Sequence, residues 1–474
     1  MAKHVPPADE DHKEGGWGWV VVLATFVCIC FSKGTNVSLG IFFVAFLDHF
    51  DRGAGETSWI PSMAAGMSWM IAPLSSALAT KYGHRKIVAA GSVICFVAVL
   101  MSSFSRSMWQ LIATVGFLNG IGYGMIHSPV TSFVGFYFKR RQAIASGLAY
   151  MGVGFGSMAL PPLFQYWISL YGWNGALLLF AGLSANLCVA ASLLRPVESK
   201  KEDGRDSENG RVHFDATSGK VISETLLTKE APIAELEEFD DYIEQETPAH
   251  SGKLSRSKCS RVVRFFGCDN LVKNFYYMSF LMAFAIFSVG QIISVVHLAP
   301  RIVSVGQSKE RTALLLSLYG AGNIVGAPAW GLLVSHSKRI RDNVDIFMAF
   351  AYVMYGVTVL LAPLATNTVS IAFLVIAMGF ERGSFSAQTV VLVRKAVGSE
   401  LFTIGYGWSL LSASFGQLIG APISGYIVDS TGSYAYSFYL AGMLIVGSGF
   451  MLFAISAFVR RQGSKMKQRT STEG

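Results

Sequence analysis

The sequence predicts an all-α membrane protein with twelve transmembrane helices in two six-helix halves, and its composition, length and recurring apolar stretches support this. Charged residues make up only 14% of the chain and hydrophobic residues 52%, with a mean hydropathy of +0.45. A soluble globular protein has about 25% charged residues. A spanning helix needs about 20 mostly apolar residues, so twelve spans use roughly 240 positions. This composition disfavours secreted, nucleic-acid-binding and soluble-enzyme classes.

The individual spans follow from apolar runs bounded by charge clusters and by Gly, Pro or Asn turns. They are expected near residues 20–45, 60–80, 87–104, 109–131, 142–167, 173–194, 273–299, 311–335, 344–363, 368–391, 402–427 and 435–458. The first run is too long and begins too late for a cleaved signal peptide. The predicted segments are a tail at 1–16, a half at 17–194, a largely disordered polar linker at 195–272, a half at 273–459 and a basic tail at 460–474.

The distribution of Lys and Arg predicts the orientation. The loops and tail on one side carry sixteen basic residues, namely Lys81, Arg85, Lys86, Lys139, Arg140, Arg141, Lys338, Arg339, Arg341, Arg394, Lys395, Arg460, Arg461, Lys465, Lys467 and Arg469. The other side carries five, namely Arg52, Arg106, Arg301, Lys309 and Arg311. By the positive-inside rule, both termini and the linker are expected in the cytosol.

The two halves resemble each other. Residues 161–182 align without a gap with residues 421–442, at a constant offset of 260 positions. The coinciding pairs are Pro162 and Pro422, Tyr166 and Tyr426, Gly172 and Gly432, Ala181 and Ala441, and Gly182 and Gly442. Parallel repeats of six spans are typical of carriers that rock two halves around a site near the bilayer midplane.

Two short motifs flank the first span and the fifth. The first motif, EGGWGW, consists of Glu14, Gly15, Gly16, Trp17, Gly18 and Trp19. The second, YFKRRQAIASGLAYMG at 137–152, contains the basic cluster Lys139, Arg140 and Arg141. Together they resemble the two signature motifs of the monocarboxylate transporter family, within the major facilitator superfamily. The resemblance runs through all twelve spans and implies the major facilitator fold. Gln142 departs from it, since the family usually has a further basic residue there.

Each motif also has an interpretation from its residues alone. Tryptophans beside glycines at the start of a span are typical of an interfacial aromatic belt with a tight turn. In the second motif, small residues such as Ala145 and Gly152 allow close helix contact, and the basic cluster anchors the interface. Gating by that basic cluster, as the two halves rock, is a compatible functional alternative.

Three charged residues are predicted at bilayer depth, where a charge is costly and therefore suggests function. Lys33 lies midway along the first span, and Glu381 and Arg382 lie midway along the tenth. Adjacent helical residues diverge by about 100°, so one of the last two faces a central path and the other a neighbouring helix. Two positive charges against one negative leave one positive charge for an anion, and an arginine holds a carboxylate with two hydrogen bonds.

Structural roles are the alternatives for these charges. Glu381 and Arg382 would then form an internal ion pair that fixes helix packing, and Lys33 would pair with a backbone carbonyl or with another helix. The midplane position of all three residues favours function.

The chain departs from the proton-coupled members of the family at informative places. Those members carry a lysine one helical turn further along span one, where this chain has Val37. They also carry an aspartate and an arginine in span eight, where this chain has Asn323 and Ala327. The resemblance therefore does not support proton symport by that route, although Glu381 with Arg382 could supply an acid and guanidinium pair from span ten instead. Asn323 is expected to offer a hydrogen bond.

Four more polar residues within the spans are candidates for function. His127 in span four and His297 near the end of span seven can carry a proton, or can be hydrogen-bonded packing residues. Asn36 and Gln388 can line the substrate path as uncharged hydrogen-bond partners, or can join helices.

Motifs of other functional classes are absent from the sequence. There is no P-loop, no HExxH, no GxSxG and no Cys/His metal cluster, so the chain is not expected to be an enzyme, and neither a cofactor nor a metal is expected. The sequence does not support a channel, because it contains no repeated segment that resembles an ion-selectivity filter. A non-transporting sensor on the same scaffold stays open, and measured substrate turnover would separate it from a carrier.

The sequence therefore predicts a secondary transporter of small monocarboxylates of the lactate, pyruvate and ketone-body class in the plasma membrane. It is expected to work by alternating access. Proton symport through Glu381 is one of the alternatives that the sequence leaves open. The alternative is a pH-independent facilitator of other small solutes, such as aromatic amino acids or creatine. The expected partners are a small organic anion, a proton and the lipid bilayer, without nucleic acid. The resemblance adds a single-span glycoprotein as a candidate chaperone.

Overall fold

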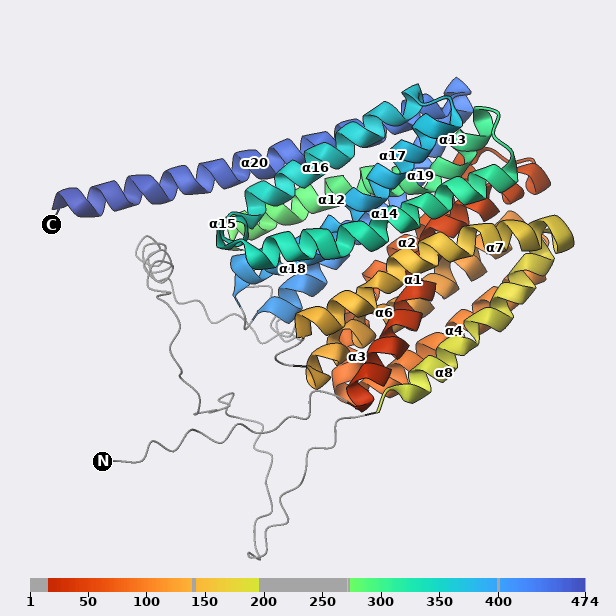
Figure 1. Ribbon diagram of the computed structural model, residues 1–474, viewed down its shortest axis with the longest axis horizontal. Coiled ribbons are helices and arrows are strands. Elements are labelled where there is room, and N and C mark those ends of the chain that lie inside the picture. The colour runs from red at the N-terminus through yellow and green to blue at the C-terminus, as the bar shows by residue number, and fades with distance from the viewer. Residues whose placement is uncertain (1–15, 139–141, 196–270, 272, 399–400, 474) are drawn as a thin grey trace, which may run out of the picture. The chain divides into compact units, whose positions relative to one another are not determined.

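The computed structural model of the chain describes residues 16–138, 142–195, 271, 273–398 and 401–473, and every regular element in these ranges is a helix (Figure 1). The first half consists of α1 (Trp17–Phe50), α2 (Ala54–Met70), α3 (Ala72–Tyr82), α4 (His84–Ser103), α5 (Met108–Leu111), the π-helical η1 (Ile112–Leu118), α6 (Asn119–Tyr137), α7 (Gln142–Ser184) and α8 (Asn186–Leu193). The second half consists of α12 (Phe275–Val296), α13 (Leu298–Ser304), α14 (Lys309–His336), α15 (Lys338–Asp342), α16 (Val344–Leu361), the 3₁₀ turn η2 (Ala362–Leu364), α17 (Thr368–Arg382), α18 (Ser384–Val397), α19 (Phe402–Thr431) and α20 (Tyr434–Glu473). Nearly all of the predicted linker lies outside the described residues.

These helices account for twelve membrane passes. Within the described ranges, eight helical stretches are long and apolar enough to cross a membrane. One of them, Ala145–Leu193, has 49 residues, which is about twice the length of a single crossing. Three further passes are interrupted, by Ile71 between α2 and α3, by η1 in the fourth pass and by Gly383 between α17 and α18. The predicted all-α membrane fold is confirmed.

Two glycines at matching positions of the predicted repeat reverse the chain direction. Gly172 inside α7 and Gly432 after α19 both have a φ of 69°, in the region that L side chains rarely adopt. Each is preceded ten residues earlier by a proline inside a helix, Pro162 or Pro422. We call the end of the helical body that holds these glycines and residues 51–53 the distal end. The opposite end, where α1 begins, is the proximal end.

The two halves pack together along two helix pairs. α2 runs beside α19. α7 runs beside α14, as Figure 1 also shows. The backbones approach closely where both partners are small. A Cβ on Gly425 would lie 2.6 Å from the carbonyl oxygen of Ala54, and one on Gly320 would lie 2.5 Å from that of Gly154. Small residues allow such helix contacts in membranes, where packing drives association.

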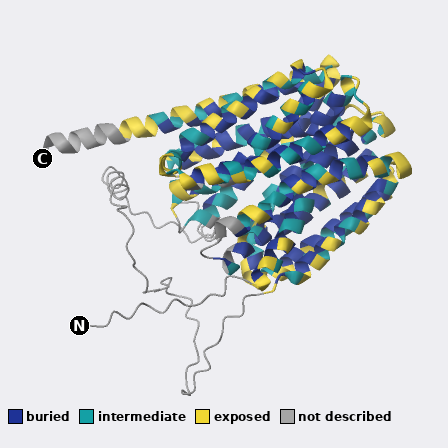
Figure 2. Cartoon of the chain, viewed as in Figure 1, coloured by how far each residue is buried: buried dark blue, intermediate teal, exposed yellow. Residues whose placement is uncertain are grey.

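Exposed residues lie along the outward faces of the helices (Figure 2). Large hydrophobic side chains remain exposed along them, for example Phe373 at 71%, Val325 at 62% and Phe450 at 61%. Polar side chains such as Ser62, Ser288 and Ser424 are instead buried between helices. A soluble protein would bury such apolar side chains, so this inside-out distribution indicates a surface in contact with lipid.

The contact between α1 and α7 yields a first prediction. A Cβ on Gly34 would lie 2.5 Å from the Cα of Gly156, a distance that real Cβ contacts do not reach. We expect Gly34→Ala to destabilise the folded protein by about 1–3 kcal/mol, because the two backbones must separate. The measurement is the Tm of the detergent-solubilised protein, with Gly182→Ala as the control, since a Cβ there meets nothing within 4 Å. An unchanged Tm for Gly34→Ala would contradict this packing.

Candidate functional site

Lys33 lies at the midpoint of α1 and contacts α2. α1 has 34 residues, from Trp17 to Phe50, so Lys33 sits half a helix from either end. Its Nζ donates to the Ser68 hydroxyl at 3.4 Å and lies 5.0 Å from the centroid of the Trp69 ring. An aromatic face attracts an ammonium group electrostatically, but it does not neutralise the charge. Neither contact neutralises the Lys33 amine, so it remains available to a further partner.

Arg382 lies at the junction of α17 and α18. Its guanidinium group is 5.2 Å from the ring of Phe385 and forms a hydrogen bond with the Tyr319 hydroxyl on α14. Glycines set this position, because a Cβ on Gly379 would lie 2.0 Å from the Tyr319 carbonyl oxygen and one on Gly383 would lie 2.3 Å from the Ala327 nitrogen. The α17 backbone thus lies directly against α14, and Arg382 reaches past it into the interior.

The two cations come from different halves and interact. Arg382 is close enough to Lys33 for their charges to repel each other. Among the described residues, no carboxylate forms an ion pair with either one. Two positive charges inside a low-dielectric body are unfavourable unless an anion joins them. Lys33 of span one and Arg382 of span ten thus lie within electrostatic range of each other, one from each half.

Glu381 faces a different direction from Arg382. Its Oε1 lies 3.1 Å from the Thr358 hydroxyl on α16, and the side chain is only 7% exposed. The same hydroxyl lies 3.1 Å from the carbonyl oxygen of Met354. A hydroxyl has one proton to donate, so if it donates to Met354, a protonated Glu381 donates to it in turn. An ion pair between Glu381 and Arg382, the structural alternative, is not found among the described residues.

The three uncharged candidates occupy different environments. Asn36 lies three residues after Lys33 on α1, is half-buried, and shares the face of Lys33. Asn323 is buried on α14, one turn after Tyr319, so it faces the same region as the Arg382 contact. Gln388 on α18 is fully buried, and neither atom of its amide has a hydrogen-bond partner in the described part of the chain. Asn36 and Asn323 therefore lie near the cations. Gln388 lies on α18, seven residues after Glu381 in sequence.

His127 lies toward the proximal end from Lys33, close enough to interact with its charge. The His127 ring packs against Tyr150 of α7, with 6.3 Å between ring centroids. The Tyr150 hydroxyl is hydrogen-bonded to that of Tyr406 on α19. The hydroxyl pair of Tyr150 and Tyr406 thus joins the two halves on the proximal side of the cation site. The His127 ring packs against one member of this pair, Tyr150.

His297, the other histidine candidate, lies at the distal end. It is fully buried, with Nε2 3.1 Å from the Ser58 hydroxyl of α2 and Nδ1 3.2 Å from the Ser424 hydroxyl of α19. Ser58 donates its proton to the Ala54 carbonyl, so His297 donates to Ser58 from Nε2 and accepts from Ser424 at Nδ1. A neutral ring satisfies both bonds, and it connects the two halves away from the cations.

Asp429 on α19 forms a second connection between the halves at the distal end. Its carboxylate accepts hydrogen bonds from the backbone N–H of Ala54 at 2.6 Å and from that of Gly55 at 2.9 Å. Gly53, the residue before α2, has no side chain to cap these donors. The positive end of the α2 dipole also favours the carboxylate. We call this contact of Asp429 with the start of α2 the distal latch.

The two signature motifs meet in space at the proximal end. The Trp19 ring lies 5.0 Å from that of Phe138, and a Cβ on Gly18 would lie 3.0 Å from the Phe138 ring. The Trp17 indole donates to the Leu193 carbonyl at 3.0 Å. Both tryptophans are partly exposed, at 37% and 39%. This arrangement agrees with an interfacial belt. Glu14, Gly15, Lys139, Arg140 and Arg141 lie outside the described residues.

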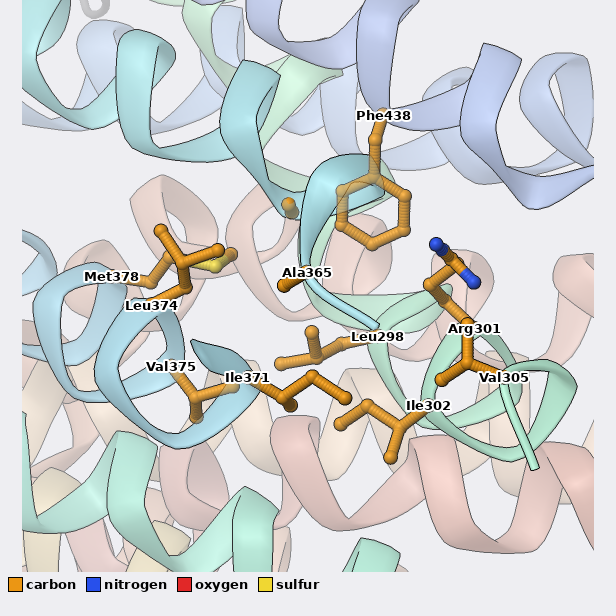
Figure 3. Close-up of a pocket in the computed structure, with 11 residues that line it drawn as sticks. Leu298, Arg301, Ile302, Val305, Ala365, Ile371, Leu374, Val375, Met378 and Phe438 are labelled. Carbon is orange, nitrogen blue, oxygen red and sulfur yellow. The ribbon is translucent and has the colours of Figure 1, made fainter. Parts of the chain in front are cut away.

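An apolar pocket lies apart from the cation site, near the distal end of the second half. Leu298, Arg301, Ile371 and Phe438 are among its lining residues (Figure 3). The pocket has a volume of about 20 Å³, which is room for about one water molecule. Arg301 donates to the Pro363 carbonyl at 2.8 Å. The pocket is thus too small for an organic solute.

Sequence reasoning did not single out several residues of the site. They are Ser68, Trp69, Tyr319, Phe385 and Asp429. Aromatic and hydroxyl residues are frequent in all spans, so composition gives no signal for the first four. Asp429 did offer one, because it is the one acidic residue between 402 and 431, and an acid within a span is costly.

The all-helical fold with its two packed halves is that of a secondary transporter. The family model described as Major Facilitator Superfamily matches residues 21–342 and also 279–473. Monocarboxylate transporter 2 of Meriones unguiculatus is 30% identical over 98% of this chain and 89% of its own length. Monocarboxylate transporter 13 of Rattus norvegicus is 30% identical over 93% of the chain and 89% of its own length.

A third relative comes from a fish. Monocarboxylate transporter 12-B of Danio rerio is 28% identical over 97% of this chain and 91% of its own length. These similarities cover both halves from end to end. The chain belongs to the monocarboxylate transporter family of the Major Facilitator Superfamily, as its two signature motifs predict, and it is a transporter and not an enzyme.

Proposed function

We propose that the chain carries small monocarboxylates, of the lactate, pyruvate and ketone-body class, across the plasma membrane in symport with a proton. The observation that carries this proposal is the pair of interior cations. Lys33 and Arg382 repel each other and have no carboxylate partner among the described residues. One carboxylate between them relieves the repulsion, and the printed names of the relatives favour this class of substrate.

The proposed binding geometry uses the different chemistry of the two cations. The guanidinium of Arg382, held by Phe385 and Tyr319, presents parallel N–H donors to both carboxylate oxygens. Lys33 adds a point charge from the opposite half. A substrate bound to both residues links the halves, so its binding favours the conformation in which they approach each other. Asn36 and Asn323 add hydrogen bonds to a hydroxyl or keto group.

Alternating access follows from the contacts at the two ends. The positive-inside rule places the proximal end in the cytosol and the distal end outside. The distal latch and the His297 contacts join the halves at the distal end, which supports closure of the outer end in this state. Rocking of the halves breaks these contacts and exposes Lys33 and Arg382 to the outside. The Tyr150–Tyr406 pair joins the halves on the cytosolic side in the same structure, and it must separate before substrate reaches the cytosol.

Glu381 is proposed as the proton site. Glu381 is buried, which disfavours a charged carboxylate, and it lies next in sequence to the proposed substrate ligand Arg382. A substrate anion and a proton together add no net charge to the carrier. Such neutral loading avoids moving an uncompensated charge through the membrane.

Tracer uptake into expressing cells tests the proposal. We expect saturable uptake of lactate, pyruvate and hydroxybutyrate that is several-fold faster at an external pH of about 6 than at about 7.5, because proton supply rises at the lower pH. Creatine and aromatic amino acids serve as comparison substrates. Saturable monocarboxylate uptake that is indifferent to pH would contradict the symport. Uptake of none of the monocarboxylates at normal surface expression would contradict the proposed function itself.

A further inference from the structure

Three residues on the α17–α18 segment carry buried polar atoms without a hydrogen-bond partner in the described part of the chain. These atoms are Oε2 of Glu381, Oγ of Ser384 and both amide atoms of Gln388. Ser384 and Gln388 are 0% exposed, and Glu381 is 7% exposed. A buried polar atom without a partner is rare and unfavourable, because it loses its bonds to water on folding. Several in one segment point to a shared ligand.

The three residues share one face of the helix. Gly383 between α17 and α18 has a φ of −61° and a ψ of −23°, so the helical path continues through the junction. At about 100° per residue, Ser384 and Gln388 both lie within about 60° of the direction of Glu381. Side chains of a helix lean toward its N-terminus, so Gln388 reaches toward Ser384 and Ser384 toward Glu381. The rise between neighbouring members is about 4.5–6 Å, the spacing that one water molecule bridges.

The surroundings of this face leave few competing charges. On α16, Thr358 bonds Glu381, and Tyr355 is the titratable group that interacts with it electrostatically. The cavity that Glu381 borders is lined on α14 by Ala321, Gly322 and Val325, which carry no charge. On the segment itself, Arg382 points to Tyr319 instead. A small, neutral hydrogen-bonding molecule fits such a setting better than an ion does.

We propose that Glu381, Ser384 and Gln388 hold a chain of water molecules through which Glu381 exchanges its proton with the cytosolic side, separately from the substrate. The Glu381 acid transfers its proton to the adjacent water, which passes a proton to the next, and the remaining carboxylate accepts a hydrogen bond from Thr358. Gln388 holds the outermost water through its amide oxygen and NH₂ group. The same face continues to Lys395, exposed and ion-paired with Asp345 at 3.4 Å at the proximal end. This inference rests on the proposed proton symport.

The test compares two transport modes of the Gln388→Leu variant. Net uptake down a proton gradient requires that Glu381 release its proton inside, whereas exchange of labelled for unlabelled substrate across preloaded vesicles does not. We expect Gln388→Leu to lower net lactate uptake about tenfold and to leave exchange within about twofold of wild type. Gln165→Leu, the same change at a buried glutamine of α7, is the control and should leave the ratio of the two modes unchanged.

Each outcome bears on the inference. If net uptake and exchange fall together, Gln388 acts on structure or on substrate binding, and the proposed water chain is wrong. If neither mode changes, it is wrong as well. Should the leucine variant fail to fold, Ser384→Ala replaces it with the same expected split between modes. If the wild-type protein carries lactate without pH dependence, the proposed symport is wrong. That result is distinct from a failure of the water chain, which only the comparison of the two transport modes reveals.

Discussion

Replacing Arg382 by glutamine is expected to lower monocarboxylate uptake roughly 100-fold or more, without loss of surface expression. The guanidinium group supplies two charge-assisted hydrogen bonds to the carboxylate, each contributing about 1.5–3 kcal/mol. Every 1.4 kcal/mol is about a factor of ten in affinity. Glutamine keeps the length of the stem and one N–H donor group, but it removes the charge. Initial rates of lactate uptake, normalised to surface protein, measure the effect.

Two comparisons separate this role from a general effect of removing a charge. Arg106→Gln removes an arginine from an exposed position between α4 and α5 and should leave uptake unchanged. Arg382→Lys keeps the charge but loses the fork of donors, so it should retain partial uptake. Normal uptake by Arg382→Gln would overturn the assignment of this residue to substrate binding.

Replacing Asp429 by asparagine is expected to shift the protein toward a state that is open at the distal end. The substitution removes the charge that two backbone N–H groups and the α2 dipole stabilise, at 2.6 and 2.9 Å. Loss of one charge-assisted hydrogen bond destabilises the closed state by about 1.5–3 kcal/mol. The population open at the distal end therefore rises about tenfold or more. Ser62→Cys reports it, since Ser62 is 0% exposed and shares the α2 face of Gly55 and Gly66, which contact α19.

The readout is the rate at which an impermeant maleimide labels that cysteine in intact cells. We expect labelling about tenfold faster when Asp429→Asn is added, in line with the population shift. Asp48→Asn is the matched control, because Asp48 also joins the halves, through Lys309 at 2.5 Å, but both partners are about half exposed. Exposed ion pairs contribute little, so labelling should barely change. Equal labelling with and without Asp429→Asn would show that the latch does not hold the distal end closed.

Most of the fold was predictable because the bilayer restricts the chain so strongly. Apolar runs of about 20 residues between basic loops can only be helices that cross the membrane. The repeat also located the reversals, since Gly172 and Gly432 adopt the same φ. What the sequence did not show is where the regular α-helical pattern is interrupted within a pass. Ile71 and Gly383 interrupt their passes, and η1 widens the fourth, inside apolar sequence that carries no distinct signal.

The candidate site was predictable where charge is costly and unpredictable where geometry decides. Lys33 and Arg382 stood out because ions are rare at bilayer depth. Adjacent positions alone indicated that Glu381 and Arg382 diverge, but not that Glu381 would face Thr358. Nor could the sequence show that His297 joins Ser58 to Ser424, because that contact depends on how two distant helices pack. The roles assigned to all these residues remain predictions.

The most direct measurement is lactate flux in liposomes that contain only the purified protein and an imposed proton gradient. The account predicts that labelled lactate accumulates above its external concentration while the inside is alkaline, and that an ionophore which dissipates the gradient abolishes this accumulation. Liposomes with the Lys33→Gln variant should show neither behaviour. Absence of saturable lactate flux through the folded wild-type protein, or full accumulation through Lys33→Gln, would contradict a monocarboxylate carrier built around Lys33 and Arg382.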